Sequence, residues 1–202
     1  MTVIDVYADI WCPFTHVGLK RLVEQRAARG DGVTLRVRPW PLELVNGKPM
    51  DAHFIGEEVD DLREQAAGDL FSGFDVEAFP TTTLPALALV ESAYRIGDAE
   101  GERLSLALRD ALFEEGRDIS DPHVLNTIAD AAGLPPAIPA DTEAVLAEWE
   151  QGKERGVVGS PHFFTEHGAF FCPALDIKRV DGHLRIAPDL PAFETFVEAC
   201  FA

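Results

Sequence analysis

Cysteine is scarce in this sequence, and its copies lie far apart. The 202 residues contain three cysteines, at positions 12, 172 and 200. An odd number at such separations is not a disulfide framework and lacks the paired spacing of a structural zinc site. The histidines and acids contain no His-x-x-x-His or comparable ligand set, so we expect no metal site. Cysteine usage of this kind fits a reducing compartment.

Basic residues and long apolar runs are scarce as well. Lysine and arginine total 17 against 35 acids, which gives a formal net charge of −18. This charge disfavours nucleic acid and anionic membrane surfaces as partners. The sequence offers neither an apolar run long enough to span a bilayer nor a secretory leader. We therefore expect a cytoplasmic protein, monomer or homodimer, that binds neither nucleic acid nor membrane.

The amino-terminal stretch changes from strand to helix at Cys12. Residues 3–7 are β-branched or aromatic with one acid, and after Pro13 the apolar residues take helical spacing. Proline suits the first turn of a helix, which places Cys12 at the cap among unpaired amides. The positive end of the helix dipole favours thiolate, the reactive form of cysteine. Cys12 is therefore the predicted nucleophile; the alternative is an inert buried cysteine.

A strand–helix–strand unit and a helical block follow. Residues 33–38 alternate apolar and polar and predict a second strand, which completes a βαβ unit. Helical patterns then dominate, with a linker marked by Pro135, Pro136 and Pro139. The predicted helices cover residues 57–71, 84–96, 100–115, 121–132 and 142–155.

The carboxyl-terminal part returns to strands. Residues 157–164 and 169–173 predict a β-hairpin, in which pairing Phe164 with Ala169 brings Pro161 opposite Cys172. Residues 174–187 show no clear pattern beyond a turn at 181–182. Residues 191–201 predict a closing helix with Cys200 on its buried face.

Three features together carry a family resemblance. They are the run from Asp9 to Thr15 with Gly18, the run from Gly156 to Pro161, and the helical block between them. In this order they resemble the DsbA family in its FrnE-like branch, and more distantly kappa-class glutathione transferases and 2-hydroxychromene-2-carboxylate isomerases. The resemblance implies an α/β thioredoxin fold with an all-helical insertion. Residues 1–45 and 157–202 would form the thioredoxin-like domain, and residues 46–156 the insertion.

The resemblance also assigns roles within the site. Pro161 would be the cis-proline that faces Cys12, with the backbone of Ser160 turned toward a bound thiol or peptide. Family oxidases carry a second cysteine where this chain has Thr15. A threonine cannot form a disulfide, but its hydroxyl could donate to the Cys12 sulfur; otherwise Thr15 is an ordinary helix-start residue.

Further residues are candidates for substrate binding or disulfide resolution. Cys172 returns to the Pro161 end of the hairpin, so it is a candidate resolving thiol for Cys12, with packing as the alternative. Trp11 and Phe14 either rim the substrate site or pack against the insertion. His16 either tunes Cys12 or is an exposed polar residue. The other candidates for substrate contact are Pro13, His16, Ser160 and His162.

These features predict a thiol-disulfide oxidoreductase or isomerase that uses a single active-site cysteine. The expected substrate is a thiol or disulfide, of a protein or of glutathione. We expect no bound cofactor, with glutathione as a co-substrate. The alternatives are a glutathione-dependent transferase or isomerase, in which Cys12 and Thr15 orient the glutathione thiolate, and a non-catalytic module that binds a peptide or small molecule.

Overall fold

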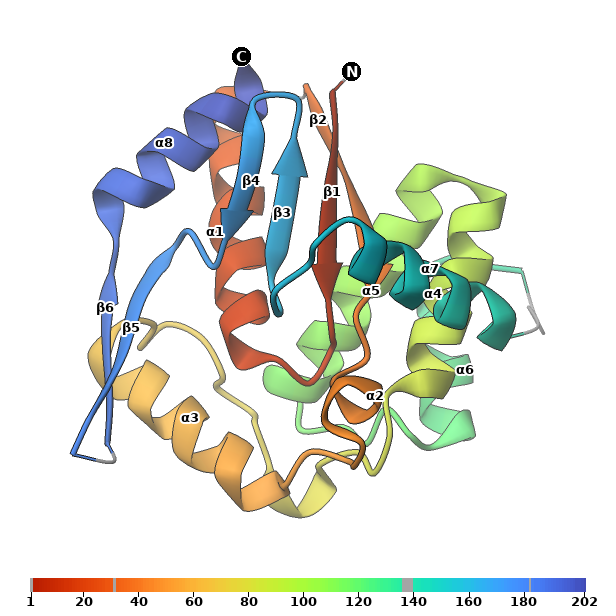
Figure 1. Cartoon of the computed structure of the whole chain (residues 1–202). Coiled ribbons are helices and arrows are strands. Elements are labelled where there is room, and N and C mark those ends of the chain that lie inside the picture. Colours follow the sequence, from red (N-terminus) through yellow and green to blue (C-terminus); the bar gives the residue numbers. More distant parts are fainter. Residues whose placement is uncertain (1, 31, 136–139, 182) are drawn as a thin grey trace.

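The chain has a central four-stranded sheet with strand order β2-β1-β3-β4 (Figure 1). The computed structural model describes residues 2–30, 32–135, 140–181 and 183–202. Strand β1 (Thr2–Ala8) runs parallel to β2 (Val33–Pro39) and antiparallel to β3 (His162–Thr165). Strand β3 pairs with β4 (Gly168–Phe171), also antiparallel. The predicted α/β class is confirmed.

Helix α1 (Pro13–Arg29) connects β1 to β2 and forms the predicted βαβ unit. Together with the closing helix α8 (Leu190–Phe201) it covers one face of the sheet (Figure 1). The alternation in β1 explains this packing, because every second residue points to that face. The buried cluster there contains Ile4, Val6, Ala8, Leu19, Leu22, Phe163, Phe196, Val197 and Cys200.

The β3–β4 hairpin has the predicted register. Phe164 pairs with Ala169, Phe163 with Phe170 and His162 with Phe171. The first strand is shorter than predicted, because residues 157–161 form a loop rather than a strand. The hydrogen bond from the Cys172 N–H to the Pro161 carbonyl, 3.0 Å, extends the pairing by one step.

Helices fill the segment between β2 and β3. They are α2 (Leu42–Asn46), α3 (Ala52–Gln65), the 3-10 helix η1 (Val76–Ala78), α4 (Leu84–Ile96), α5 (Asp98–Phe113), α6 (Pro122–Ala131) and α7 (Thr142–Glu154). No helix in the described parts of the chain combines the length and apolarity that crossing a membrane requires. Residues 136 and 139, two of the three prolines of the predicted linker, lie outside the described residues.

Helix α3 differs from its prediction at both ends. It begins at Ala52 because the Asp51 carboxylate accepts the Phe54 N–H at 2.9 Å and caps the first turn. It ends at Gln65, so the apolar residues Leu70 and Phe71 lie in the loop that follows. Both are buried there, which is why their apolar character resembled that of a helix face.

Residues 175–180 and 183–188 form the two strands of a hairpin that the sequence analysis did not predict, and residue 182 of the predicted turn lies outside the described residues. Strands β5 (Leu175–Val180) and β6 (His183–Pro188) make a separate two-stranded sheet. The hairpin packs on α3, where the Ile186 N–H donates to the Gln65 side chain at 3.0 Å. Leu184 and Ile186 are buried and alternate with exposed neighbours, the period-2 pattern that would have indicated a strand.

The helical block covers the free edge of β2. The Tyr94 hydroxyl of α4 accepts the Val37 N–H at 2.8 Å and donates to the Leu35 carbonyl at 3.0 Å. The Glu102 carboxylate of α5 accepts the Leu35 N–H at 2.8 Å. An uncovered edge would leave these backbone groups without partners inside the protein. The insertion is therefore joined to the sheet through specific side chains.

The packing of the Tyr94 ring against Gly101 predicts that alanine substitutions at two helix glycines, Gly101 and Gly56, have opposite effects on stability. A Cβ at Gly101 would lie 2.1 Å from the Tyr94 ring, whereas a Cβ at Gly56 would lie 3.6 Å from Val76, an ordinary contact. Gly101→Ala should destabilise the fold by about 1–3 kcal/mol through overpacking. Gly56→Ala should be neutral or stabilise by about 0.5–1 kcal/mol. Urea unfolding measures both; a shift of the same sign in the two variants would contradict the close contact.

Candidate active site

Cys12 is the N-cap of α1 and faces the loop before β3. Its backbone is extended and Pro13 occupies the first helical turn, as predicted. The Cys12 thiol donates to the carbonyl oxygen of Ser160 at 3.1 Å. Cys12 is 4% exposed, so its sulfur is nearly enclosed by the protein. The Cys12 sulfur thus contacts the backbone of Ser160, a residue 148 positions later in the chain.

The loop that faces Cys12 is tied to two further segments. The peptide bond between Ser160 and Pro161 is cis. The Ser160 hydroxyl lies 2.8 Å from the Thr15 hydroxyl and accepts the Asp9 N–H at 3.0 Å. The structure therefore brings Cys12, Thr15, Ser160 and Pro161 together at the end of β1. Each of the four was a predicted site residue.

Two buried charged residues that the sequence analysis did not assign lie beside this cluster. The Asp9 carboxylate accepts the N–H groups of Trp11 at 3.2 Å and Leu42 at 2.5 Å. Arg109, on α5, is 1% exposed and donates to the Asp9 carbonyl at 2.6 Å. Burial lowers the pKa of Arg109 to about 10, and the negative charges of Asp9 and Cys12 oppose that shift. The insertion thus places a cation within electrostatic reach of Cys12.

The burial of Arg109 could have been inferred from the sequence. It lies between Leu108 and Leu112 on the buried face of α5, four residues after the buried Ser105. A charged residue at a core position of an amphipathic helix is rare unless it has a partner. The partner, Asp9, belongs to the run that carried the family resemblance.

Burial determines the protonation of Cys12 in this structure. It raises the pKa of the Cys12 thiol, and hydrogen bonding by the Thr15 hydroxyl, Ser160 and the Thr15 amide lowers it in part. The negative charge of Glu58, on α3, raises it further. The helix terminus was expected to favour a thiolate, but the pKa of Cys12 is raised, because desolvation is the largest influence on it. The resting group is a thiol that donates to Ser160.

Trp11 packs against the insertion instead of forming a substrate rim. It is 0% exposed, its indole N–H donates to the Pro80 carbonyl at 3.2 Å, and its ring stacks on Phe79 with centroids 5.9 Å apart. Pro13 is buried as well, and the half-buried Phe14 packs against the same apolar cluster. Of the two interpretations of the Trp11 side chain, packing is the one that the structure supports.

Apolar surface near the Ser160 loop comes from other residues. Val158 is 71% exposed and Phe171 is 53% exposed. The Phe171 ring covers Gly159, where a Cβ would approach it to 2.7 Å. No sequence signal pointed to these two side chains as a group, because their adjacency depends on the hairpin.

His16 is enclosed within the protein. It is 1% exposed, its Nε2 lies 2.7 Å from the Glu114 carboxylate, and its ring packs on Phe71 and Phe113. Burial lowers the pKa of His16, against the effect of Glu114. The alternative of an exposed polar residue is wrong, because the loop after α3 closes over the ring, and the enclosed ring leaves no surface for a substrate to contact. The role of tuning Cys12 stays a prediction.

His162 supports the loop from its own strand. It is 8% exposed, its Nδ1 accepts the Val158 N–H at 3.3 Å, and its ring contacts Phe164 and Phe171. Burial and the charge of Arg155 lower the pKa of His162. The ring thus fixes the backbone that leads to Ser160 and presents little surface to a ligand.

The comparisons with known proteins agree with this fold. A family model for the DsbA-like thioredoxin domain matches residues 3–185. The chain belongs to the DsbA-like thioredoxin family. The predicted fold, a thioredoxin fold of this family, is confirmed. A search of curated proteins found no significant match.

Solved structures with a similar fold have low sequence identity to this DsbA-like protein. A probable DsbA oxidoreductase from Streptomyces coelicolor is 21% identical, with TM-score 0.64 over 99% of this chain and 88% of that one. The cytosolic disulfide reductase DsbM from Pseudomonas aeruginosa is 17% identical, with TM-score 0.62 over 97% of each chain. It has also been solved with GSH. A 2-hydroxychromene-2-carboxylate isomerase is 17% identical, with TM-score 0.62 over 84% of this chain and 88% of that one.

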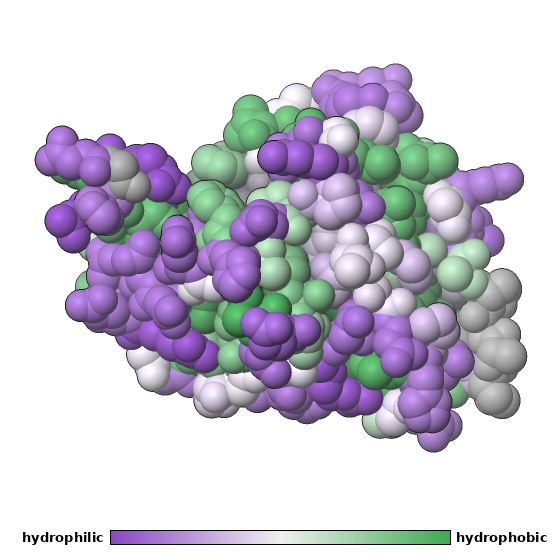
Figure 2. All heavy atoms as spheres, turned by 90° about the horizontal axis from the view of Figure 1, so that it is seen from below, coloured by the Kyte–Doolittle hydropathy of each residue, from purple (hydrophilic) through white to green (hydrophobic). Residues whose placement is uncertain are grey.

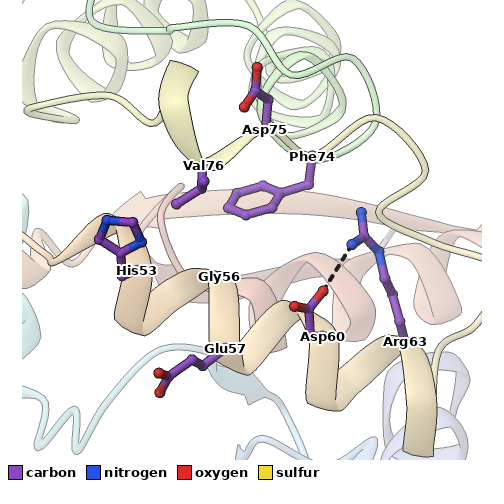
Figure 3. Close-up of a pocket in the computed structure, with 8 residues that line it drawn as sticks. All are labelled: His53, Gly56, Glu57, Asp60, Arg63, Phe74, Asp75 and Val76. Carbon is purple, nitrogen blue, oxygen red and sulfur yellow. Dashed lines mark hydrogen bonds and ion pairs between the residues drawn. The ribbon is translucent and has the colours of Figure 1, made fainter.

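The DsbA-like protein also has an open hollow of about 380 Å³ in its insertion, between α3 and η1. Figure 3 shows Phe74 and Val76 on one side and His53 on the other, with Arg63 paired to Asp60. Seen from below, the surface is largely hydrophilic with separate hydrophobic areas (Figure 2). Among the described residues, no group of three His, Cys, Asp or Glu side chains is arranged to hold a metal ion.

The surroundings of Cys12 predict a pH profile for its alkylation. Its rate should rise with a midpoint above the ordinary thiol pKa of 9.0, because burial disfavours the thiolate. Thr15→Val should move the midpoint up and Glu58→Gln should move it down, since the first removes a hydrogen bond and the second a negative charge. Iodoacetamide labelling, located by peptide mass spectrometry, measures the midpoints. A wild-type midpoint below 9.0 would contradict this account.

The His16–Glu114 pair predicts a loss of stability in acid. Burial opposes ionisation of Glu114, but hydrogen bonds from His16 and from the Phe71 and Ser72 amides outweigh it and lower the pKa to about 2. This stabilisation is present above the unfolded value of 4.5 and is lost as the pH falls toward 2. The lowered pKa of His16 acts in the same direction below its unfolded value of 6.5.

Glu114→Gln tests this linkage, because the amide does not titrate and keeps one of the two oxygens that accept the neighbouring N–H groups. The variant should be less stable at neutral pH by about 1–3 kcal/mol. Its free energy of unfolding in urea should fall less than that of the wild type between neutral pH and about pH 3. Equal slopes in the two proteins would refute the assignment.

Proposed function

We propose that this chain is a thiol-disulfide oxidoreductase in which Cys12 is the nucleophile and Thr15 stands where a second cysteine would lie. The observation that carries the proposal is the contact between the Cys12 sulfur and the Ser160 carbonyl, at the cap of α1. A disulfide that approaches Cys12 would meet the Ser160–Pro161 backbone. The exposed side chains of Val158 and Phe171 offer apolar contact beside it.

The first step of the reaction is disulfide exchange. The Cys12 thiolate attacks one sulfur of a disulfide RSSR′, which breaks the S–S bond, leaves R joined to Cys12 as a mixed disulfide, and releases R′ as a thiolate. A second thiol must then attack the mixed disulfide to release R. A free thiol such as glutathione can do this. If it attacks the sulfur of R, R leaves as a mixed disulfide with glutathione and Cys12 is restored. If it attacks the Cys12 sulfur, R leaves as a thiolate and glutathione stays joined to Cys12. The structure of the Pseudomonas reductase with GSH supports glutathione as the thiol to test.

Residues around Cys12 can stabilise the thiolate once the proton has left. The Thr15 hydroxyl and amide lower the pKa of Cys12 against the effect of burial. Arg109 adds a positive charge within reach. Because these groups are held by the end of β1, by α1 and by α5, they need little rearrangement when the charge develops. The scarcity of cysteine supports a cytoplasmic location for this chemistry.

A second candidate function is a glutathione-dependent isomerase. The observation in its favour is that Cys12 is a neutral thiol that donates a hydrogen bond. A neutral S–H group and the Thr15 hydroxyl could both donate to the thiolate of bound glutathione, so that Cys12 would not be consumed. The isomerase of similar fold acts on 2-hydroxychromene-2-carboxylate, which is the first substrate to try.

Substitution of Cys12 separates the two functions. Cys12→Ser should abolish reduction of a glutathionylated model peptide by reduced glutathione, because a hydroxyl cannot form the mixed disulfide. Thr15→Val should slow it about tenfold through the loss of a hydrogen bond to a charged sulfur. Cys200→Ala, which removes a buried thiol in another cluster, is the matched control and should retain activity. Loss of exchange with retained isomerisation would instead support the second function.

A further inference from the structure

Cys12 and Cys172 form hydrogen bonds with two consecutive residues of one loop, Ser160 and Pro161. The Cys12 sulfur donates to the carbonyl of Ser160 at 3.1 Å, and the Cys172 N–H donates to the carbonyl of Pro161 at 3.0 Å. Cys172 directly follows β4 and lies in the apolar cluster that contains Ile10 and Trp11, the two residues before Cys12. The hairpin therefore returns a second cysteine to the end of the sheet where Cys12 lies.

The backbone at Cys172 is unusual for a cysteine. Its φ is 45°, in the left-handed region that glycine and asparagine usually occupy. The side chain is nonetheless buried, at 9% exposure. A cysteine at such a position, bonded to the same loop as Cys12, points to a role for its sulfur.

The two cysteines also interact electrostatically. Burial, with a smaller contribution from the negative charge of Cys12, raises the pKa of Cys172 to about 12. Formation of a mixed disulfide removes the charge from Cys12, and with it that part of the shift. Cys172 would thus ionise more readily when Cys12 carries a substrate than when Cys12 is a thiolate. Both cysteines are free in this structure.

We propose that Cys172 is the resolving thiol of this site and replaces the second cysteine that Thr15 does not supply. The inference rests on the proposed exchange function. The Cys172 thiol loses its proton and its sulfur attacks the Cys12 sulfur of the mixed disulfide. A Cys12–Cys172 bond forms, the bond from Cys12 to the substrate sulfur breaks, and the substrate leaves as a thiolate that takes up a proton. Overall, one disulfide is reduced to two thiols and the two cysteines are oxidised. Two equivalents of a free thiol then reduce the internal disulfide and restore the enzyme.

Oxidised glutathione is the probe for this step. Wild-type protein treated with it should lose two hydrogen atoms, with a cross-linked Cys12–Cys172 peptide in the digest. Cys172→Ser should instead gain one glutathionyl group on Cys12 and retain it. Cys12→Ser should gain none at Cys172, because that thiol is buried and without Cys12 no disulfide is held beside it. Cys200→Ala should behave as the wild type, and circular dichroism checks that each variant is folded.

The outcomes separate the inference from the function on which it rests. A stable glutathionyl group on Cys12 of the wild type, with no internal disulfide, would overturn the role of Cys172 and leave exchange by Cys12 intact. Absence of any adduct on Cys12 in Cys172→Ser would overturn the proposed function. Diamide oxidation of the wild type, which needs no glutathione recognition, provides a second measurement. Failure of diamide to form the Cys12–Cys172 bond would overturn the pairing itself, because a disulfide requires Cα atoms within about 7 Å.

Discussion

The site depends on Ser160, which joins three parts of the chain that are distant in sequence. Its carbonyl oxygen accepts a hydrogen bond from the Cys12 thiol. Its hydroxyl forms a hydrogen bond with the Thr15 hydroxyl and accepts another from the Asp9 N–H. The end of β1, the first turn of α1 and the loop before β3 thereby take fixed relative positions. A hydroxyl serves this purpose because it can donate one hydrogen bond and accept others at the same time. Without this joint, Cys12 would be a capping residue with no facing group.

The helical block contributes chemistry to the site as well as cover. Arg109 reaches the Asp9 carbonyl from α5, and Glu114, just past the same helix, fixes His16 and the Phe71 amide. A buried guanidinium is costly unless it is hydrogen-bonded and near negative charge. The negative charge of Asp9 supplies part of that compensation, and Cys12 adds to it only when it is ionised. An ionised Cys12 and a buried Arg109 would therefore stabilise each other. The charge interaction at the site thus involves both the insertion, which carries Arg109, and the thioredoxin-like part, which carries Cys12.

The sequence predicted the parts of this structure that depend on local pattern, and it failed where tertiary contacts decide. The bounds of α4 were predicted from the helical pattern of residues 84–96, and the hairpin register followed from pairing Phe164 with Ala169. The burial of His16 could not be predicted, because it depends on Glu114 and on a loop from another element. The pKa direction of Cys12 was missed for a related reason: helix position is local, whereas desolvation depends on everything that packs around the sulfur.

The presence of threonine at position 15 has a structural consequence for where a resolving thiol can lie. A thiol is a weak hydrogen-bonding group, so a cysteine at position 15 would weaken the link that Thr15 makes with Ser160. The chain keeps that link and with it the orientation of the loop that faces Cys12. A second sulfur must then approach from outside α1. The β3–β4 hairpin is suited to this, because the same pairing that fixes Pro161 also fixes Cys172, so one set of backbone hydrogen bonds positions both the substrate-facing loop and the second sulfur.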